Sequence, residues 1–308
     1  MPERVVNLGG LRDVFVGQLA ATYELVAIDD PRAATATAAV TTGGIGISAA
    51  QIAALPRLRV VSGFGVGYDR VDIAAARARG IVVTNTPGLT DRCVADHAMA
   101  LFLAVARRVA EGDRFVRAGR WTSGRLPGLA HRATGRKLGI LGMGRIGMQI
   151  ARRAAAFDMP VGYHNRNPRT DTAHRYFPSV ATLAARADVL VVASPGGAAT
   201  RHLVDAAALA ALGPDGVIVN IARGTIIDEA ALLAALKSRA IAGAGLDVFE
   251  DEPRMSQAFH LLDNAVLTPH IAGSTEETWG DCEAMAAENL RRHFAGEALL
   301  SPIPELAP

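Results

Sequence analysis

Cysteine, lysine and long apolar runs are scarce in this chain of 308 residues. Its two cysteines, Cys93 and Cys282, lie far apart and fit no CxxC or Cys/His spacing, which argues against a disulfide scaffold or a zinc site and predicts no metal centre. The longest apolar run, 98–106, is too short to span a bilayer, and the N-terminus has no pattern typical of a secretory signal. We therefore expect a cytoplasmic protein without a membrane segment.

Aromatic residues make up 5% of the chain, and neither sign of charge is in large excess, since the net charge is +2. The basic residues are almost all arginine, with Lys137 and Lys237 the only lysines, and no four basic residues follow one another. A nucleic-acid partner is therefore not expected. Hydrophobic residues make up 50% of the chain, which is enough for a packed core, and the length favours about two domains.

Short apolar runs alternate with alanine-rich helical stretches, a rhythm typical of βαβ units. One series covers about ninety residues, and a second series of six strands begins at KLGILGMGRIG. Between them the pattern predicts a long connecting helix from Asp91 to Gly119, and a last helix is predicted from Glu276 to Gly296. The sequence thus predicts an α/β fold of two Rossmann-like or flavodoxin-like lobes, each a doubly wound parallel sheet, with a cleft between them.

The same pattern predicts how the chain is divided between the two lobes. We expect residues 1–98 plus 276–308 to form a substrate-binding domain. Residues 99–275 are expected to form a dinucleotide-binding Rossmann domain.

Three glycines, Gly142, Gly144 and Gly147, form G-x-G-x-x-G directly after an apolar strand and before a helical pattern. One glycine permits a tight turn, the second lets the backbone approach a pyrophosphate, and the third lets helix and strand pack closely. We therefore expect this turn, with Arg145 and Ile146 at the start of the helix, to bind the pyrophosphate of a dinucleotide.

The end of the following strand indicates which dinucleotide is bound. An NAD-binding chain usually places Asp or Glu there, to accept hydrogen bonds from the ribose hydroxyls. This chain has Asn165, followed by Arg166 and, one turn later, Arg169. An acid would repel a 2′-phosphate, whereas a guanidinium can pair with it through two hydrogen bonds. The sequence therefore predicts NADP(H) in preference to NAD(H).

Three further segments follow predicted strands of the same domain: NIARG, GLDVFEDEP and TPHIAGST. They carry Arg223, Glu252 and His270 at the sheet edge where doubly wound folds hold ligands. An acid–base pair beside a fixed cation suits reversible hydride transfer between a 2-oxo acid and a 2-hydroxy acid.

The charges of these three side chains assign their roles. His270, as an imidazolium, would donate a proton to the carbonyl oxygen as hydride reaches the carbonyl carbon. Glu252 would favour the charged ring near neutral pH and orient it, with Glu250 and Asp251 as alternative partners. Arg223 would bind the substrate carboxylate and polarise the carbonyl group.

These segments, together with GMGRIG, SGFGVGYDRVD and TDRCVADHAMALFLAVARR, resemble the D-isomer-specific 2-hydroxyacid dehydrogenase family over nearly the whole chain. The resemblance implies a catalytic role for the arginine, glutamate and histidine named above. It also implies that Asp247 contacts the nicotinamide carboxamide, and we expect Ala222 to contact the cofactor as well. Backbone amides of Gly65, Val66 and Gly67 would hold the substrate carboxylate, in keeping with how glycine-rich backbone presents N–H groups to anions.

Within the family, HNRNPR and GFGVG look most like segments of NADPH-dependent glyoxylate/hydroxypyruvate reductases. Family members are typically homodimers formed through the dinucleotide domain, with the arm around Arg107 to Trp121 contributing. The substrate is then a small 2-oxo acid and the product its 2-hydroxy acid. Two alternatives remain: a dehydrogenase for another D-2-hydroxy acid, such as lactate or 3-phosphoglycerate, and a dinucleotide-sensing interaction protein.

Overall fold

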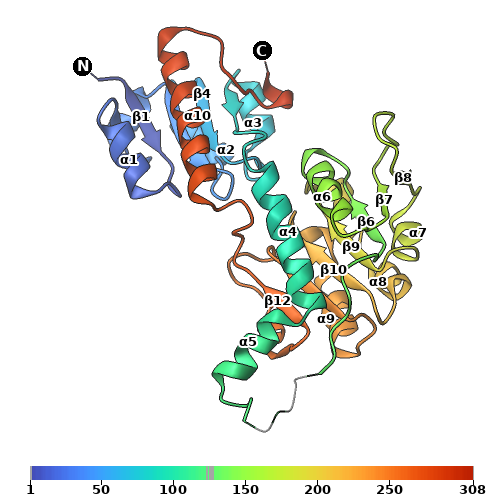
Figure 1. Ribbon diagram of the computed structural model, residues 1–308. Coiled ribbons are helices and arrows are strands. Elements are labelled where there is room, and N and C mark those ends of the chain that lie inside the picture. The colour runs from blue at the N-terminus through green and yellow to red at the C-terminus, as the bar shows by residue number, and fades with distance from the viewer. Residues whose placement is uncertain (1, 123, 125–127, 308) are drawn as a thin grey trace. The chain divides into compact units, whose positions relative to one another are not determined.

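A computed structural model describes residues 2–122, 124 and 128–307 (Figure 1). The chain forms two compact units, the first comprising Met1–Thr90 and Thr275–Pro308 and the second Asp91–Ser274. The first boundary expected from the sequence, after residue 98, falls inside helix α4 (Asp91–Ala106). The whole helix belongs to the second unit because it packs on α6 (Arg145–Ala155) and on the sheet of that unit.

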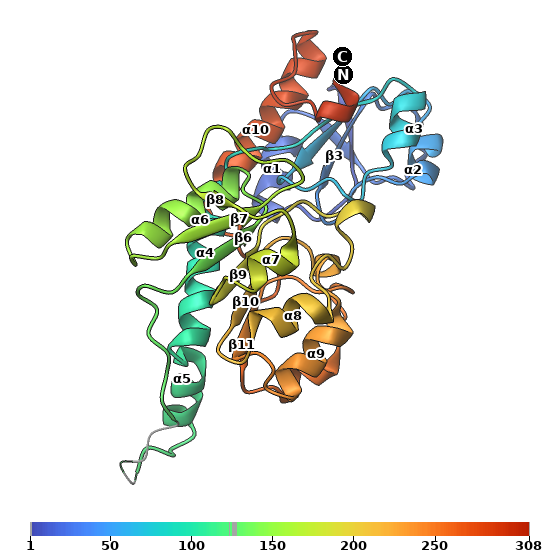
Figure 2. The ribbon, with the colours of Figure 1, turned by 90° about the vertical axis from the view of Figure 1, so that its right-hand side faces the viewer.

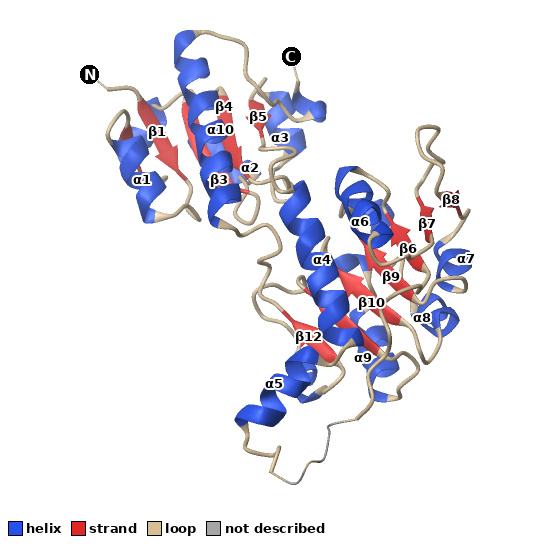
Figure 3. Ribbon diagram, viewed as in Figure 1, coloured by secondary structure: helices blue, strands red, loops and turns tan. Residues whose placement is uncertain are grey.

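The first unit is built on five parallel strands in the order β2-β1-β3-β4-β5, which is the flavodoxin-like order. The strands are β1 (Arg4–Asn7), β2 (Glu24–Val26), β3 (Ala38–Thr42), β4 (Val60–Phe64) and β5 (Val82–Thr84). Figure 3 shows the helices on both faces of this sheet. They are α1 (Asp13–Ala20) and α10 (Glu276–Ala295) on one face, and α2 (Ala49–Ala54), α3 (Ile73–Ala78) and the short turns η1 (Pro31–Thr35) and η5 (Pro304–Leu306) on the other.

Successive apolar side chains of one strand supply both cores of this unit. Val5 packs with Phe15 and Leu290 on the α1/α10 face, whereas Val6 packs with Ile52 on the opposite face. Both valines are fully buried. Because side chains alternate across a sheet, a strand covered on both faces reads as a continuous apolar run, as seen here.

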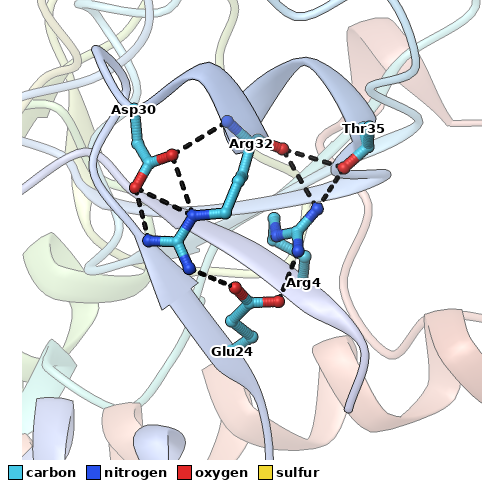
Figure 4. Close-up of polar contacts among 5 residues, drawn as sticks. All are labelled: Arg4, Glu24, Asp30, Arg32 and Thr35. Atoms are coloured by element: carbon cyan, nitrogen blue, oxygen red, sulfur yellow. Dashed lines mark hydrogen bonds and ion pairs between the residues drawn. The ribbon is translucent and has the colours of Figure 1, made fainter. Parts of the chain in front are cut away.

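An ion-pair network ties η1 to the edge of this sheet (Figure 4). The Glu24 carboxylate binds Arg4 at 2.5 Å and Arg32 at 2.6 Å. Asp30 accepts the backbone N–H of Arg32 at 2.8 Å and also pairs with its guanidinium, while Arg4 donates to Thr35. Solvent-exposed ion pairs add little to stability, and here each charge already has its partner, so we assign this network a structural role only.

The second unit is built on seven parallel strands in the order β12-β11-β10-β9-β6-β7-β8. Counted from β6, the order is 3-2-1-4-5-6 with one more strand added, the Rossmann arrangement. The strands are β6 (Leu138–Leu141), β7 (Val161–His164), β8 (Arg175–Tyr176), β9 (Val189–Val192), β10 (Val217–Asn220), β11 (Gly243–Leu246) and β12 (Ala265–Leu267). The predicted α/β fold with two doubly wound parallel sheets is confirmed.

Helices cover both faces of the second sheet. Helices α4 and α6 bury one face. The other face is covered by α7 (Val180–Ala184), α8 (Ala206–Leu212) and α9 (Glu229–Lys237), which Figure 2 shows in succession. Short 3-10 turns are η2 (Ala198–Thr200), η3 (Gly224–Ile226) and η4 (Gln257–Leu261). None of the helices formed by the described residues has both the length and the apolar composition that a membrane span requires.

The single connecting helix predicted from Asp91 to Gly119 is wrong. The chain forms α4 and then α5 (Val109–Arg117), and Arg108 between them adopts a left-handed backbone with φ of +55°. The Arg108 guanidinium binds Glu111 through two hydrogen bonds of 2.6 and 2.7 Å. Apolar residues continue at helical spacing across the break, so periodicity alone could not reveal it.

Candidate active site

The turn between β6 and α6 has the backbone geometry of an anion-binding loop. Gly142 has a φ of +103°, and a Cβ there would lie 2.5 Å from the backbone nitrogen of Ser194, at the end of β9. A Cβ on Gly147 would lie 2.3 Å from the carbonyl oxygen of Gly142. Around Gly144, which caps α6, the same position is open space. A tight turn, close packing and an open helix start together fit a dinucleotide pyrophosphate.

The two residues that begin α6 differ in their surroundings. Arg145 directs its guanidinium to Asp91, at 2.9 Å between Nε and Oδ2. Ile146 packs against the core on the α4/α6 face of the sheet. Their side chains thus fasten the helix, which leaves the backbone N–H groups of its first turn as the groups suited to an anion.

The loop after β7 contacts the glycine turn at Met143, the residue between the first two glycines. Asn165 accepts the backbone N–H of Met143 at 2.6 Å, and Arg169 donates to its carbonyl oxygen at 3.1 Å. Arg166 is exposed and has no hydrogen bond or ion pair within the described ranges. The three predicted cofactor residues of this loop therefore have different surroundings.

Arg223 lies in the loop that follows β10. The buried side chain of Asn220 accepts the N–H of Ala222 at 3.1 Å and donates to the carbonyl oxygen of Arg223 at 3.0 Å. A Cβ on Gly224 would lie 1.9 Å from the carbonyl carbon of Phe249, so only glycine allows this approach. Asn220 and Gly224 thereby fix the backbone on both sides of the arginine. The NIARG segment alone did not indicate this role of Asn220.

The imidazole of His270 is paired with Glu252. His270 Nδ1 lies 2.7 Å from Glu252 Oε2, while Glu252 Oε1 accepts the N–H of Phe249 at 2.9 Å. His270 has a left-handed backbone with φ of +54°, and its ring is half-exposed, with 51% of the side chain accessible. Nδ1 is held by the carboxylate, and Nε2 is the ring nitrogen that can serve a substrate.

The two alternative carboxylates are engaged elsewhere. Glu250 binds Arg201 at 2.5 Å and His202 at 3.1 Å. Asp251 lies 3.7 Å from Arg254. The structure thus pairs His270 with Glu252, rather than with either neighbour.

The Glu252 carboxylate remains ionised although it is half-buried. Burial opposes ionisation, but the hydrogen bonds from His270 and Phe249 outweigh it, together with the charges of His270 and Arg223, so the pKa of Glu252 lies below its ordinary value. The influence of Arg223 on this carboxylate places all three predicted catalytic residues in one electrostatic neighbourhood.

Asp247 is fully buried, and its carboxylate binds the loop that carries His270. Oδ1 accepts the N–H of Ile271 and the hydroxyl of Thr268, and Oδ2 accepts the N–H of Ala272, at distances of 2.6 to 2.9 Å. His97 Nε2, on α4, lies 2.9 Å from the same Thr268 hydroxyl oxygen and 3.4 Å from Asp247 Oδ1. Because the hydroxyl donates its own hydrogen to the carboxylate, Nε2 is the donor in this cluster. Sequence reasoning missed His97 and Thr268, although a histidine on a mostly apolar helix was an available signal.

These contacts set the ionisation of Asp247. Burial raises its pKa, but the hydrogen bonds from His97, Thr268 and the two backbone amides outweigh burial, so the pKa lies below its ordinary value. The charged carboxylate is therefore part of what holds the loop of His270 in place.

Replacing Asp247 with Asn is expected to reduce the free energy of unfolding by about 2–3 kcal/mol at pH 7, because an amide NH₂ would face the N–H of Ala272. A lowered folded-state pKa stabilises the fold above the unfolded value of about 4 and stops doing so as pH falls through the folded value. The difference between wild type and variant should thus shrink below pH 4 in denaturant titrations. Asp251→Asn, the same change at an exposed site, should alter stability by less than about 0.5 kcal/mol; equal effects would contradict the loop role.

The predicted substrate loop lies in the first unit, whereas the three residues above lie in the second. Gly65 has a φ of +94°, and its N–H donates to Thr86 at 2.9 Å. The Val66 carbonyl oxygen accepts from Asn85 at 2.8 Å. Among the described residues, the N–H groups of Val66 and Gly67 have no partner, so these two amides are better suited to a carboxylate than that of Gly65.

Comparison with known proteins relates these features to a family. The family described as "D-isomer specific 2-hydroxyacid dehydrogenase, NAD binding domain" matches residues 99–272. The chain belongs to the D-isomer-specific 2-hydroxyacid dehydrogenases. Glyoxylate/hydroxypyruvate reductase A of Arabidopsis thaliana is 43% identical over 266 residues, which cover 86% of this chain and 85% of that protein. The 2-ketogluconate reductase of Gluconobacter oxydans is 44% identical over 85% of this chain and 84% of its own length.

A solved dehydrogenase structure is similar across almost the whole chain. It is the NADPH-dependent glyoxylate/hydroxypyruvate reductase of Sinorhizobium meliloti in complex with NADP and malonate, with 37% identity and a TM-score of 0.94. The match covers 99% of this chain and 98% of the solved chain. This 2-hydroxyacid dehydrogenase is therefore an oxidoreductase that uses a nicotinamide dinucleotide and acts on 2-oxo acids or 2-hydroxy acids.

Proposed function

We propose that this protein reduces glyoxylate or hydroxypyruvate to the corresponding 2-hydroxy acid with NADPH. The observation that carries the proposal is the His270–Glu252 pair, formed where Arg223 is close enough to influence the same carboxylate. The two reductases that act on these acids, described above, support the substrate class. The exposed Arg166, directly after the position where an NAD enzyme carries an acid, supports NADPH.

The glycine turn and the loop after β7 are the proposed cofactor site, with Ala222 and Asp247 on the nicotinamide side. When bound, the reduced nicotinamide supplies the hydride. His270 would donate the Nε2 proton to the carbonyl oxygen on which negative charge develops. Glu252 holds the opposite ring nitrogen and favours the imidazolium, which is the proton-donating form.

Arg223 is the proposed ligand for the substrate carboxylate. A guanidinium can donate two parallel hydrogen bonds to a carboxylate, and the positive charge also polarises the adjacent carbonyl group. The amides of Val66 and Gly67 are proposed as further donors to the carboxylate.

We also propose that the protein is a homodimer formed through α5 and works in the cytoplasm. Helix α5 buries none of its own residues, and Val109, Val116 and Trp121 are each more than half exposed. Exposed apolar side chains gathered on one helix and the segment after it are typical of a protein interface. The two widely spaced cysteines are in keeping with a reducing compartment.

The proposal is tested by following NADPH absorbance with glyoxylate, hydroxypyruvate, pyruvate and 2-oxobutyrate, with NADH in parallel. We expect turnover of the first two acids and a kcat/KM at least about tenfold higher with NADPH, the contribution of one charge-assisted hydrogen bond to a 2′-phosphate. Faster turnover of pyruvate would identify a dehydrogenase for another acid. No turnover of any acid, despite tight NADPH binding, would overturn the reductase proposal in favour of a sensing role.

A further inference from the structure

Two arginines in the loop after β7, Arg166 and Arg169, belong to the proposed NADPH site, and they differ in their contacts. Arg166 extends from the surface with no ion pair in the described part of the chain. Arg169 is bound at three of its donors. Its Nε donates to Asp171 Oδ1 at 2.8 Å, its Nη2 donates to Oδ2, and its Nη1 donates to the carbonyl oxygen of Met143 at 3.1 Å.

The backbone around Arg169 is also fixed. Its N–H donates to the hydroxyl of the buried Tyr163 at 2.8 Å. Tyr176 donates to the carbonyl oxygen of Asn165 at 3.3 Å, which anchors the other end of the segment. The loop is thus organised by the protein's own contacts, and Arg169 keeps its orientation without help from a ligand.

Two residues of this loop form hydrogen bonds with the backbone of Met143. Its N–H is bound by Asn165 and its carbonyl oxygen by Arg169. Met143 separates the first two glycines of the turn, where a shift in the backbone would displace the groups suited to the pyrophosphate. Contacts of the Arg169 side chain therefore stabilise a part of the site that NAD and NADP share.

We propose that the Arg169–Asp171 pair is a clamp on the glycine turn, and that Arg166 alone distinguishes NADPH from NADH. The two hydrogen bonds to Asp171 neutralise the Arg169 charge locally, so the pair offers little net attraction to a 2′-phosphate that carries almost two negative charges. Arg166 keeps a full positive charge and free donors. Asp171 thereby becomes a residue that limits NADPH preference. This inference rests on the proposed use of NADPH.

Adenosine 2′,5′-bisphosphate and ADP separate the two roles by binding alone, measured by isothermal titration calorimetry on the full chain. Arg166→Ala should weaken the bisphosphate roughly ten- to a hundredfold and ADP less than threefold. Arg169→Ala should weaken both probes by a similar factor. Asp171→Asn should strengthen the bisphosphate several-fold relative to ADP, because it frees a cation beside the phosphate.

Arg169→Lys is the matched control, since it keeps the charge and loses the planar fork. If Arg169 acts as a clamp, Arg169→Lys should bind both probes as weakly as Arg169→Ala does. If Arg169 instead binds the 2′-phosphate, Arg169→Lys should keep most of the affinity for the bisphosphate. Selective loss of the bisphosphate in Arg169→Ala would overturn the clamp, as would an Asp171→Asn variant that binds both probes like wild type. If Arg166→Ala weakens both probes by the same factor or leaves both unchanged, the role of Arg166 and its support for NADPH fail, while a uniform loss in Arg169→Ala would still support the clamp. Thermal unfolding of each variant confirms that the fold is retained.

Discussion

Replacing His270 with Ala is expected to lower kcat for 2-oxo acid reduction by about 10²- to 10⁴-fold while the dissociation constant for NADPH changes less than about threefold. The loss is that of a positioned general acid. The ring of His270 contacts Glu252, whereas the proposed cofactor site is built from the glycine turn and the loop after β7. NADPH binding should therefore not depend on the ring. Steady-state kinetics gives kcat, and quenching of protein fluorescence by NADPH gives the dissociation constant.

The backbone at this position calls for a second variant. His270 has a φ of +54°, a conformation that Asn tolerates better than Ala does. His270→Asn therefore keeps the loop and removes the acid, and it should lose as much kcat as His270→Ala. A variant with kcat within about fivefold of wild type would show that another group supplies the proton.

Glu252→Gln probes the partner of the same ring. It removes a negative charge and keeps a side chain of the same size, so the imidazolium loses its favourable neighbour. The expected consequence is a lower kcat for 2-oxo acid reduction at pH 7 than in wild type, with an unchanged dissociation constant for NADPH, measured as for His270→Ala.

Local constraints were the part of this protein that the sequence could predict. At Gly142 and at Gly147 a Cβ would lie within 2.5 Å of a backbone atom, so only glycine fits. Because both positions need glycine, the motif has a fixed spacing that the sequence shows. The sequence also predicts that the last helix ends at Gly296, and this glycine has the left-handed backbone at which α10 ends. The constraints on Gly147 and Gly296 involve residues that are neighbours in the chain, and the positive φ of Gly142 is local as well, although the backbone closest to it, at Ser194, is distant in the sequence.

Contacts between distant segments were not predictable in the same way. His97, Thr268 and Asp247 contact one another, and these three residues come from α4 and from the ends of two separate strands. No spacing links them, so the sequence does not show that the Asp247 carboxylate binds the loop of His270. Strand β8 was missed because its two residues are not an apolar run. The Arg169–Asp171 pair is different, since the acid follows the arginine by only two residues in the sequence.

Replacing Arg223 is expected to produce the largest loss in kcat/KM after replacing His270. Its backbone is fixed by Asn220 and by the close approach of Gly224 to Phe249, and its Nη1 donates to the carbonyl oxygen of Ala222 at 2.7 Å. The guanidinium is therefore oriented before substrate arrives, which reduces the entropy lost on binding. Two charge-assisted hydrogen bonds to a carboxylate are together worth about 3–6 kcal/mol.

Arg223→Ala should accordingly lower kcat/KM by roughly 10²- to 10⁴-fold, with a higher KM and a lower kcat, because the cation both binds the carboxylate and polarises the carbonyl. Arg223→Lys retains the charge without the fork, so it should recover part of kcat and little of KM. NADPH affinity in both variants should match wild type. If Arg223→Ala leaves KM unchanged, the carboxylate is held by other groups, with the amides of Val66 and Gly67 the first to test.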